Sequence, residues 1–213
     1  MIESILPSDV LAVQSYTDRL DITLSPREEA LIARAVPKRR AEFTTVRSCA
    51  RDALAALGVP PAPLLPDGRG APVWPSGVVG SMTHCAGYRA AAVAHARRIT
   101  SLGIDAEPNS GLPDGVLETI ARPEERSALA ALPAGGPAWD RLLFSAKESV
   151  YKAWYPVTRR WLDFKEASLV LAHDGTFTAD VLVPAPPELA RLRGRWVVEG
   201  EHVVTAVVVE RDC

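Results

Sequence analysis

Three short segments of the sequence combine acidic, basic and hydroxyl side chains of the kinds that act on phosphate groups. They read G-S-M-T-H-C at 80–85, G-I-D-A-E-P at 103–108 and F-S-A-K-E-S-V-Y-K at 144–152. In the second segment Asp105 and Glu107 end an apolar run, and alternate side chains of a strand lie on one face. Two carboxylates held so close raise the pKa of at least one, unless a cation lies between them. Short acidic pairs are also common in solvated turns, so this pair alone is a weak indication of a site.

Glu148 lies in the segment with the clearest helical pattern, from Ala138 to about Trp154. Lys152 follows it by four residues and shares its face, as in an ordinary exposed pair worth about 0.2–0.5 kcal/mol. Apolar residues are spread widely around this helix, however, and a charged group on a mostly buried helix is paired or functional. The pattern therefore favours a site over a solvated face.

Asp105, Glu107 and Glu148 together form an all-oxygen donor set suited to a hard cation. Magnesium binds through few protein carboxylates and keeps waters and substrate phosphates. The set therefore predicts a phosphate ester or anhydride as substrate, with the metal neutralising charge on the transferred group. Lys147 and Lys152 would then contact the phosphate or the leaving group.

Other basic residues could add anion contacts. His84 could donate to a phosphate or transfer a proton, because its unperturbed pKa is near neutrality, although a lone histidine is at least as often structural. The segment that follows Pro37 carries a basic face that could bind a phosphate or simply be solvated. That face consists of Arg39, Arg40, Arg47 and Arg51.

Composition excludes several classes of protein. The chain has 213 residues, 47% of them hydrophobic and 23% charged, which is typical of a globular protein. Its net charge of -2 provides no positive electrostatic field that would attract a nucleic acid. Cys49, Cys85 and Cys213 are odd in number and widely spaced, so neither a disulfide framework nor a zinc site is indicated. With no secretory leader pattern and no apolar run long enough to span a bilayer, a cytoplasmic location is expected.

The elements that must position these residues alternate between helices and small sheets. Ser25, Pro26 and Glu28 predict a capping box at the start of a helix that continues through about Ala35, and a second helix runs from Pro37 to a stop at Gly58. Strands are expected between 78 and 107, and helices at 114–120, 123–132 and 138–154. Further strands are expected at 167–171, 176–182, 193–199 and 202–210. Each half thus has helices and a small sheet, with a boundary near Gly103.

The three segments, in this order and with 43 positions between Asp105 and Glu148, resemble the Sfp-type 4'-phosphopantetheinyl transferases. The family pattern is G-(I/V/C)-D followed by W/F-(S/C/T)-x-K-E-(A/S)-x-x-K. The resemblance implies an α+β fold of two similar lobes related by a pseudo-twofold axis, 1–103 and 104–213, each a small antiparallel sheet packed with helices. The active site would lie in the cleft between the lobes of a monomer.

The resemblance also implies a reaction and the residues for it. The 4'-phosphopantetheine of coenzyme A would pass to a serine of an acyl or peptidyl carrier protein, in polyketide, peptide or fatty-acid synthesis, releasing adenosine 3',5'-bisphosphate. Asp105, Glu107 and Glu148 match the ligands of Mg²⁺ or Mn²⁺, with Glu148 or a water on the metal as the base. The expected coenzyme A contacts are Arg39, Arg40, Arg47, Thr83, His84, Lys147 and Lys152.

One departure from the family and two alternatives stay open. The family often has a lysine in a G-K-P segment, whereas this chain reads G-A-P at 70–72, so Arg69 would have to replace it. A metal-dependent phosphodiesterase or nuclease could use the same carboxylates without a carrier protein. A non-catalytic module that binds carrier proteins is the other alternative, although it would be expected to have lost the carboxylates.

Overall fold

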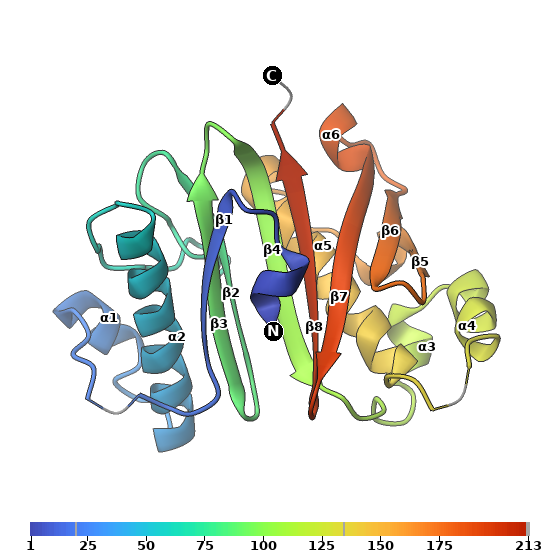
Figure 1. The fold of residues 1–213 in the computed structure, drawn as a ribbon, viewed down its shortest axis with the longest axis horizontal. Coiled ribbons are helices and arrows are strands. Elements are labelled where there is room, and N and C mark those ends of the chain that lie inside the picture. Colours follow the sequence, from blue (N-terminus) through green and yellow to red (C-terminus); the bar gives the residue numbers. More distant parts are fainter. Residues whose placement is uncertain (20, 134, 212–213) are drawn as a thin grey trace.

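The computed structural model describes residues 1–19, 21–133 and 135–211 (Figure 1). Two antiparallel sheets form its centre, one of three strands in the order β1-β3-β2 and one of five in the order β4-β8-β7-β6-β5. The strands are β1 (Val10–Ser15), β2 (Val78–Cys85), β3 (Tyr88–His95), β4 (Ile99–Pro108), β5 (Ala167–Leu171), β6 (Thr176–Val181), β7 (Arg191–Glu199) and β8 (His202–Glu210). The α-helices are α1 (Pro26–Leu31), α2 (Pro37–Ala56), α3 (Val116–Ile120), α4 (Pro123–Ala130), α5 (Trp139–Thr158) and α6 (Pro187–Ala190).

Helix α2 covers the three-stranded sheet (Figure 1). Its apolar face, with Ala50 and Leu54 fully buried, packs on Ala91 and Val93 of β3. The preceding α1 begins as predicted, because the Ser25 hydroxyl accepts the Glu28 N–H while the Glu28 carboxylate accepts the Ser25 N–H. It ends at Leu31, earlier than the sequence suggested.

Helix α5 covers the five-stranded sheet and approaches β4 very closely at Gly103. A Cβ atom at this position would lie 2.0 Å from the Ser149 carbonyl oxygen and 2.7 Å from the Ala153 nitrogen, so only glycine fits. The close approach sets the middle of α5 against the segment of β4 that carries Asp105. Val150 and Trp154 fill the core beneath the helix.

The two sheets meet along β2 and β4 through side chains. The Ile104 N–H donates to the Ser81 hydroxyl at 3.1 Å, and the Ala106 N–H donates to the Thr83 hydroxyl at 3.0 Å. The side-chain hydroxyls of Ser81 and Thr83 thus accept the N–H groups of β4, a role that backbone carbonyls have between paired strands. The first two candidate segments become direct neighbours.

The α+β fold of two antiparallel sheets with helices, predicted from the sequence, is confirmed. The predicted strands at 167–171 and 202–210 match β5 and β8, whereas β1 and a 3-10 helix at Ile2–Ile5 were not predicted. The chain passes from one sheet to the other between β3 and β4, so Gly103, the expected boundary, lies inside β4. None of the described helices is both long and apolar enough to cross a membrane. Cys49 and Cys85 are free, and Cys213 lies outside the described residues.

Candidate active site

A cavity of about 740 Å³ opens between the two sheets and collects most of the predicted basic residues. Its walls come from α2, the loop 66–74, β2 and one face of α5. Trp74 lies over Gly80, where a Cβ would come within 2.6 Å of the indole ring. Of the side chains predicted from the sequence, the lining includes Arg39, Arg47, Arg69, His84, Glu148 and Lys152.

Asp105 is the central carboxylate of the site and is only 5% exposed. Its Oδ1 accepts from the Lys152 ammonium at 2.7 Å and from the Thr83 hydroxyl at 3.3 Å. Its Oδ2 is buried and has no hydrogen-bond partner among the described residues. An orphaned carboxylate oxygen is costly unless a cation or donor completes it.

The other two carboxylates, those of Glu107 and Glu148, both have raised pKa values. Burial raises the pKa of Glu107, Asp105 raises it further, and Arg141, whose Nη1 lies 3.0 Å from the Glu107 Oε2, opposes the rise. Burial also raises the pKa of Glu148, with Lys152 lowering it and Asp105 raising it. A bound cation would relieve both groups.

The donor set fits a hard divalent cation with few protein ligands. Across residues 1–19, 21–133 and 135–211, no three acidic, histidine or cysteine side chains are grouped closely enough to be a ready-made metal centre. The ammonium of Lys152 and the guanidinium of Arg141 are the cations that contact Asp105 and Glu107. The free Asp105 Oδ2 and the raised pKa values of Glu107 and Glu148 nevertheless match the chemistry that Mg²⁺ requires.

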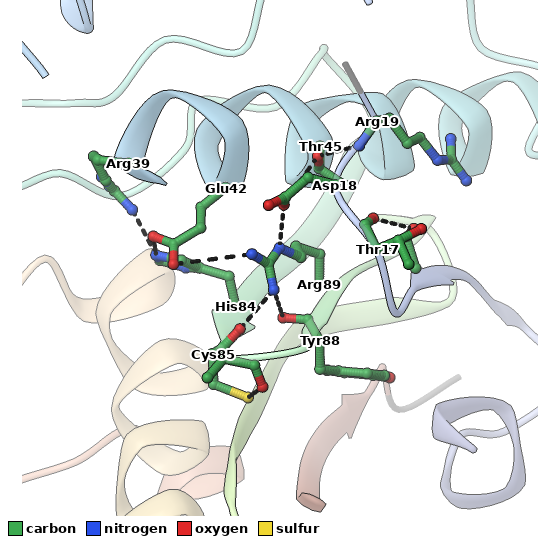
Figure 2. Close-up of polar contacts among 12 residues, drawn as sticks. Thr17, Asp18, Arg19, Arg39, Glu42, Thr45, His84, Cys85, Tyr88 and Arg89 are labelled. Atoms are coloured by element: carbon green, nitrogen blue, oxygen red, sulfur yellow. Dashed lines mark hydrogen bonds and ion pairs between the residues drawn. The ribbon is translucent and has the colours of Figure 1, made fainter. Parts of the chain in front are cut away.

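His84 belongs to a charged network that the sequence did not reveal (Figure 2). Its Nε2 lies 2.5 Å from Nη1 of Arg39, so Nε2 accepts and the ring is neutral. Burial lowers the pKa of His84 and Arg39 lowers it further, whereas Glu42, 3.7 Å away, raises it. Behind Glu42, buried Arg89 donates to the Cys85 carbonyl at 2.7 Å and pairs with Asp18 at 2.8 Å. The network holds the histidine at the wall of the cavity.

Arg47 is buried in the cavity wall. Its guanidinium lies over the Phe43 ring, 3.2 Å from the centroid, and its Nε donates to the Leu64 carbonyl. Burial lowers its pKa to about 10, against the opposing charge of Glu28 at 3.8 Å. A cation that has lost most of its water in this way gains from any anion that reaches it.

Arg40 points away from the cavity. Its guanidinium donates to the Ile32 carbonyl at 2.8 Å and pairs with Glu29 at 2.8 Å, joining α2 to α1. The structure therefore does not bring Arg40 together with the other predicted contacts of coenzyme A.

Lys147 is also separated from the cavity. Its ammonium pairs with Glu125 at 2.8 Å and donates to the carbonyls of Phe164 and Ala167 at 2.7 and 2.8 Å. All three of its donors are used, and the side chain is 1% exposed. The Lys147 ammonium thus joins α5 to its neighbours and does not line the large cavity.

A second cavity of about 120 Å³ adjoins the first, since Glu148 and Tyr151 line both. Its other walls include Lys147 and the apolar side chains of Trp161, Leu162 and Phe164. Tyr155 and Arg159, further along α5, line the larger cavity and were missed at the sequence level. The four-residue spacing of Tyr151 and Tyr155, whose rings stack at 5.9 Å, was the signal available.

Two family models and several known proteins are similar to this chain in sequence. The 4'-phosphopantetheinyl transferase N-terminal domain matches residues 27–94, and the 4'-phosphopantetheinyl transferase superfamily matches residues 101–207. The 4'-phosphopantetheinyl transferase Svp of Streptomyces mobaraensis is 57% identical over 98% of the chain and 89% of its own length. The chain belongs to the 4'-phosphopantetheinyl transferases.

Two further transferases of this family align over nearly all of the chain. PptT of Mycobacterium tuberculosis is 47% identical over 98% of both chains. Npt of Nocardia iowensis is 46% identical over 97% of this chain and 99% of its own. The family and its reaction class, phosphopantetheinyl transfer, which the three segments predicted, are confirmed.

Proposed function

We propose that this phosphopantetheinyl transferase moves the 4'-phosphopantetheine of coenzyme A onto a serine of acyl or peptidyl carrier proteins, with Mg²⁺ as cofactor. The observation that supports this most directly is the cavity between the sheets, which basic side chains line together with Glu148, and where Lys152 pairs with the buried carboxylate of Asp105. The basic side chains would bind the 3'-phosphate and the pyrophosphate of coenzyme A. The carboxylates would bind the divalent cation.

The basic side chains lie on two walls of the cavity. Arg39, Arg47 and His84 are grouped on α2 and β2, and Lys152 lies across from them on α5. We assign the first group and Arg69 to the phosphates of coenzyme A, and Lys152 to the pyrophosphate next to Asp105. In the structure Arg39 donates a hydrogen bond to His84. Its guanidinium could turn from His84 to a phosphate oxygen.

Asp105, Glu107 and Glu148 would hold the metal ion, which when bound neutralises charge on the pyrophosphate. The free Oδ2 of Asp105 supports this assignment. Thr83 supports it indirectly, because its hydroxyl fixes Asp105 while accepting the Ala106 N–H.

Glu148 is placed to take the proton of the acceptor serine. The serine oxygen would form a bond to the phosphorus that carries pantetheine, and the bond from that phosphorus to the bridging oxygen would break. Adenosine 3',5'-bisphosphate would leave, and the serine proton would pass to the Glu148 carboxylate. The small apolar cavity that shares Glu148 suits the uncharged pantetheine arm.

A single copy of the chain supplies both walls of the cavity, so we propose that it acts as a monomer. A cytoplasmic location, where coenzyme A and carrier proteins are made, follows from the same function. Its carrier proteins would belong to polyketide, nonribosomal peptide or fatty-acid synthases.

Intact-mass measurement of an apo carrier protein tests the proposal. Incubation with the enzyme, coenzyme A and Mg²⁺ should add one phosphopantetheine, and EDTA or a carrier without its acceptor serine should abolish the gain. Asp105→Asn and Glu148→Gln should lose transfer, while Asp174→Asn, in a distant turn, should keep it. Consumption of coenzyme A without a labelled carrier would favour a hydrolase. Carrier binding without any consumption would favour a non-catalytic module.

A further inference from the structure

The loop 65–74 lies between α2 and β2 in the chain, reaches over to the end of α5 and forms one wall of the large cavity. It is folded tightly, since the Asp67 N–H donates to the Ala71 carbonyl at 2.8 Å and the Val73 N–H to the Leu65 carbonyl at 2.9 Å. Ala71 at its tip packs on the core beneath α5. The side chain of Arg69, which would replace the family lysine, projects from this loop and lines the cavity.

Asp67 accepts four hydrogen bonds, two from within this loop and two from residues at the end of α5. Its Oδ1 accepts the N–H groups of Arg69 and Ala71 at 2.9 and 3.0 Å, which closes the turn. Its Oδ2 accepts the Tyr155 hydroxyl at 3.0 Å and the Arg159 guanidinium at 2.9 Å. One carboxylate thus holds the turn with one oxygen and α5 with the other.

Arg159, the partner of Asp67 at the end of α5, has a left-handed backbone conformation. Arg159 ends the helix with φ 56° and is the only residue other than glycine with a positive φ among those that the structure describes. A side chain of this size in the left-handed region costs about 1 kcal/mol. The conformation turns the guanidinium toward Asp67 and over the Tyr155 ring, at 5.6 Å from its centroid.

We propose that Asp67, Tyr155 and Arg159 form a clasp that positions the loop 65–74 for coenzyme A. The proposal rests on the function given above. Asp67 does not line the cavity, so it is a positioning residue, and it acts through Arg69 and the loop backbone. Opening the clasp would release the wall from α5 and weaken binding of coenzyme A, without touching the carboxylates that carry out the chemistry.

The Asp67→Asn variant tests the clasp, because an asparagine has a single acceptor oxygen for the turn and α5 together. We expect the KM for coenzyme A to rise about tenfold, as for loss of one hydrogen bond to a charged group. At saturating coenzyme A, kcat and the KM for the carrier protein should stay within about twofold of wild type. Asp174→Asn is the matched control, since Asp174 accepts from Thr176 in a turn far from the cavity.

A double variant separates positioning from direct contact with the ligand. If Arg159 acts through Asp67, Arg159→Gln added to Asp67→Asn should raise the KM no further, whereas independent effects would multiply. Tyr155→Phe is a milder second variant and should raise the KM in the same direction. A wild-type KM in Asp67→Asn, or multiplied effects in the double variant, would overturn the proposal.

Amide exchange of residues 68–74 without coenzyme A tests the clasp apart from the enzymatic activity. Exchange in this segment should be faster in Asp67→Asn than in wild type and unchanged in Asp174→Asn. Equal exchange in all three proteins would refute the clasp. A wild-type protein that shows the expected exchange but transfers nothing would instead refute the proposed function.

Discussion

Lys147 and Lys152 lie five residues apart on α5, and substitution of each by methionine should have opposite consequences. Methionine keeps most of the apolar stem and removes the ammonium. For Lys147→Met, the buried carboxylate of Glu125 loses its ion pair, and the carbonyls of Phe164 and Ala167 lose a donor. For Lys152→Met, the change lies in the cavity wall and the lost ion pair is that of the buried Asp105.

The magnitudes follow from burial. The side chains of Lys147 and Glu125 are each 1% exposed, and removal of one partner of a buried pair costs about 3–5 kcal/mol. For a chain of this length that corresponds to a fall in Tm on the order of 10 °C. The Lys152 side chain is 27% exposed, so its loss should cost only about 1–2 kcal/mol. Transfer by Lys152→Met should nevertheless fall about a hundredfold in kcat/KM.

Thermal unfolding and carrier-labelling kinetics at 15–20 °C below the variant's Tm measure the two effects separately. Folded Lys147→Met should show the wild-type KM for coenzyme A. Adding Glu125→Gln should recover part of its stability, because the unpaired buried charge is removed. An unchanged Tm with a raised KM for coenzyme A would refute this reasoning, and would restore Lys147 to the substrate site predicted from the sequence.

Three more perturbations have defined outcomes. Arg39→Gln should raise the pKa of His84 in an NMR titration, because a neighbouring positive charge is removed; no change would place Arg39 away from the ring. Since the pKa of His84 in the folded protein lies below the usual histidine value of 6.5, the free energy of unfolding should fall as the pH drops from that value through the folded pKa. Chemical denaturation at several pH values tests this, and a slope identical in His84→Gln would contradict it. Gly103→Ala should lower the free energy of unfolding by about 3 kcal/mol or more, because backbone atoms of α5 occupy the space of its Cβ, whereas Gly58→Ala should meet no atoms and incur only the strain of its positive φ. Equal losses in urea unfolding would refute the close approach.

Local features of the fold were predictable because they depend on neighbours in sequence. Ser25, Pro26 and Glu28 specify a helix start within four residues, and the structure has the capping box. The same Glu28 carboxylate also accepts the Leu64 N–H and pairs with Arg51. No spacing in the sequence indicates those contacts, since they depend on how the loop after α2 returns.

In the site, too, local features were predictable from the sequence and contacts between distant segments were not. The motifs predicted a site that uses Asp105 and Glu148, but could not tell Lys147 from Lys152, since both lie beside Glu148. Their difference comes from the segments at 122–125 and 164–167, which cover one side of α5 and leave the other facing the cavity. The network around His84 was hidden for a similar reason, because Asp18, Glu42 and Arg89 come from separate elements (Figure 2).

The pairing of β4 with β8 bears on the order in which the chain acquires its structure. Asp105 and Glu107 lie on β4, whose ladder partner is β8, about a hundred residues later (Figure 1). Such distant pairs form late, since a long loop must close before the strands gain any contact. During synthesis the first sheet and α2 can assemble, and Ser81 and Thr83 of β2 can hold one edge of β4. The other edge stays open until β8 emerges, so the strand that carries Asp105 and Glu107 is held on both sides only when synthesis is nearly complete.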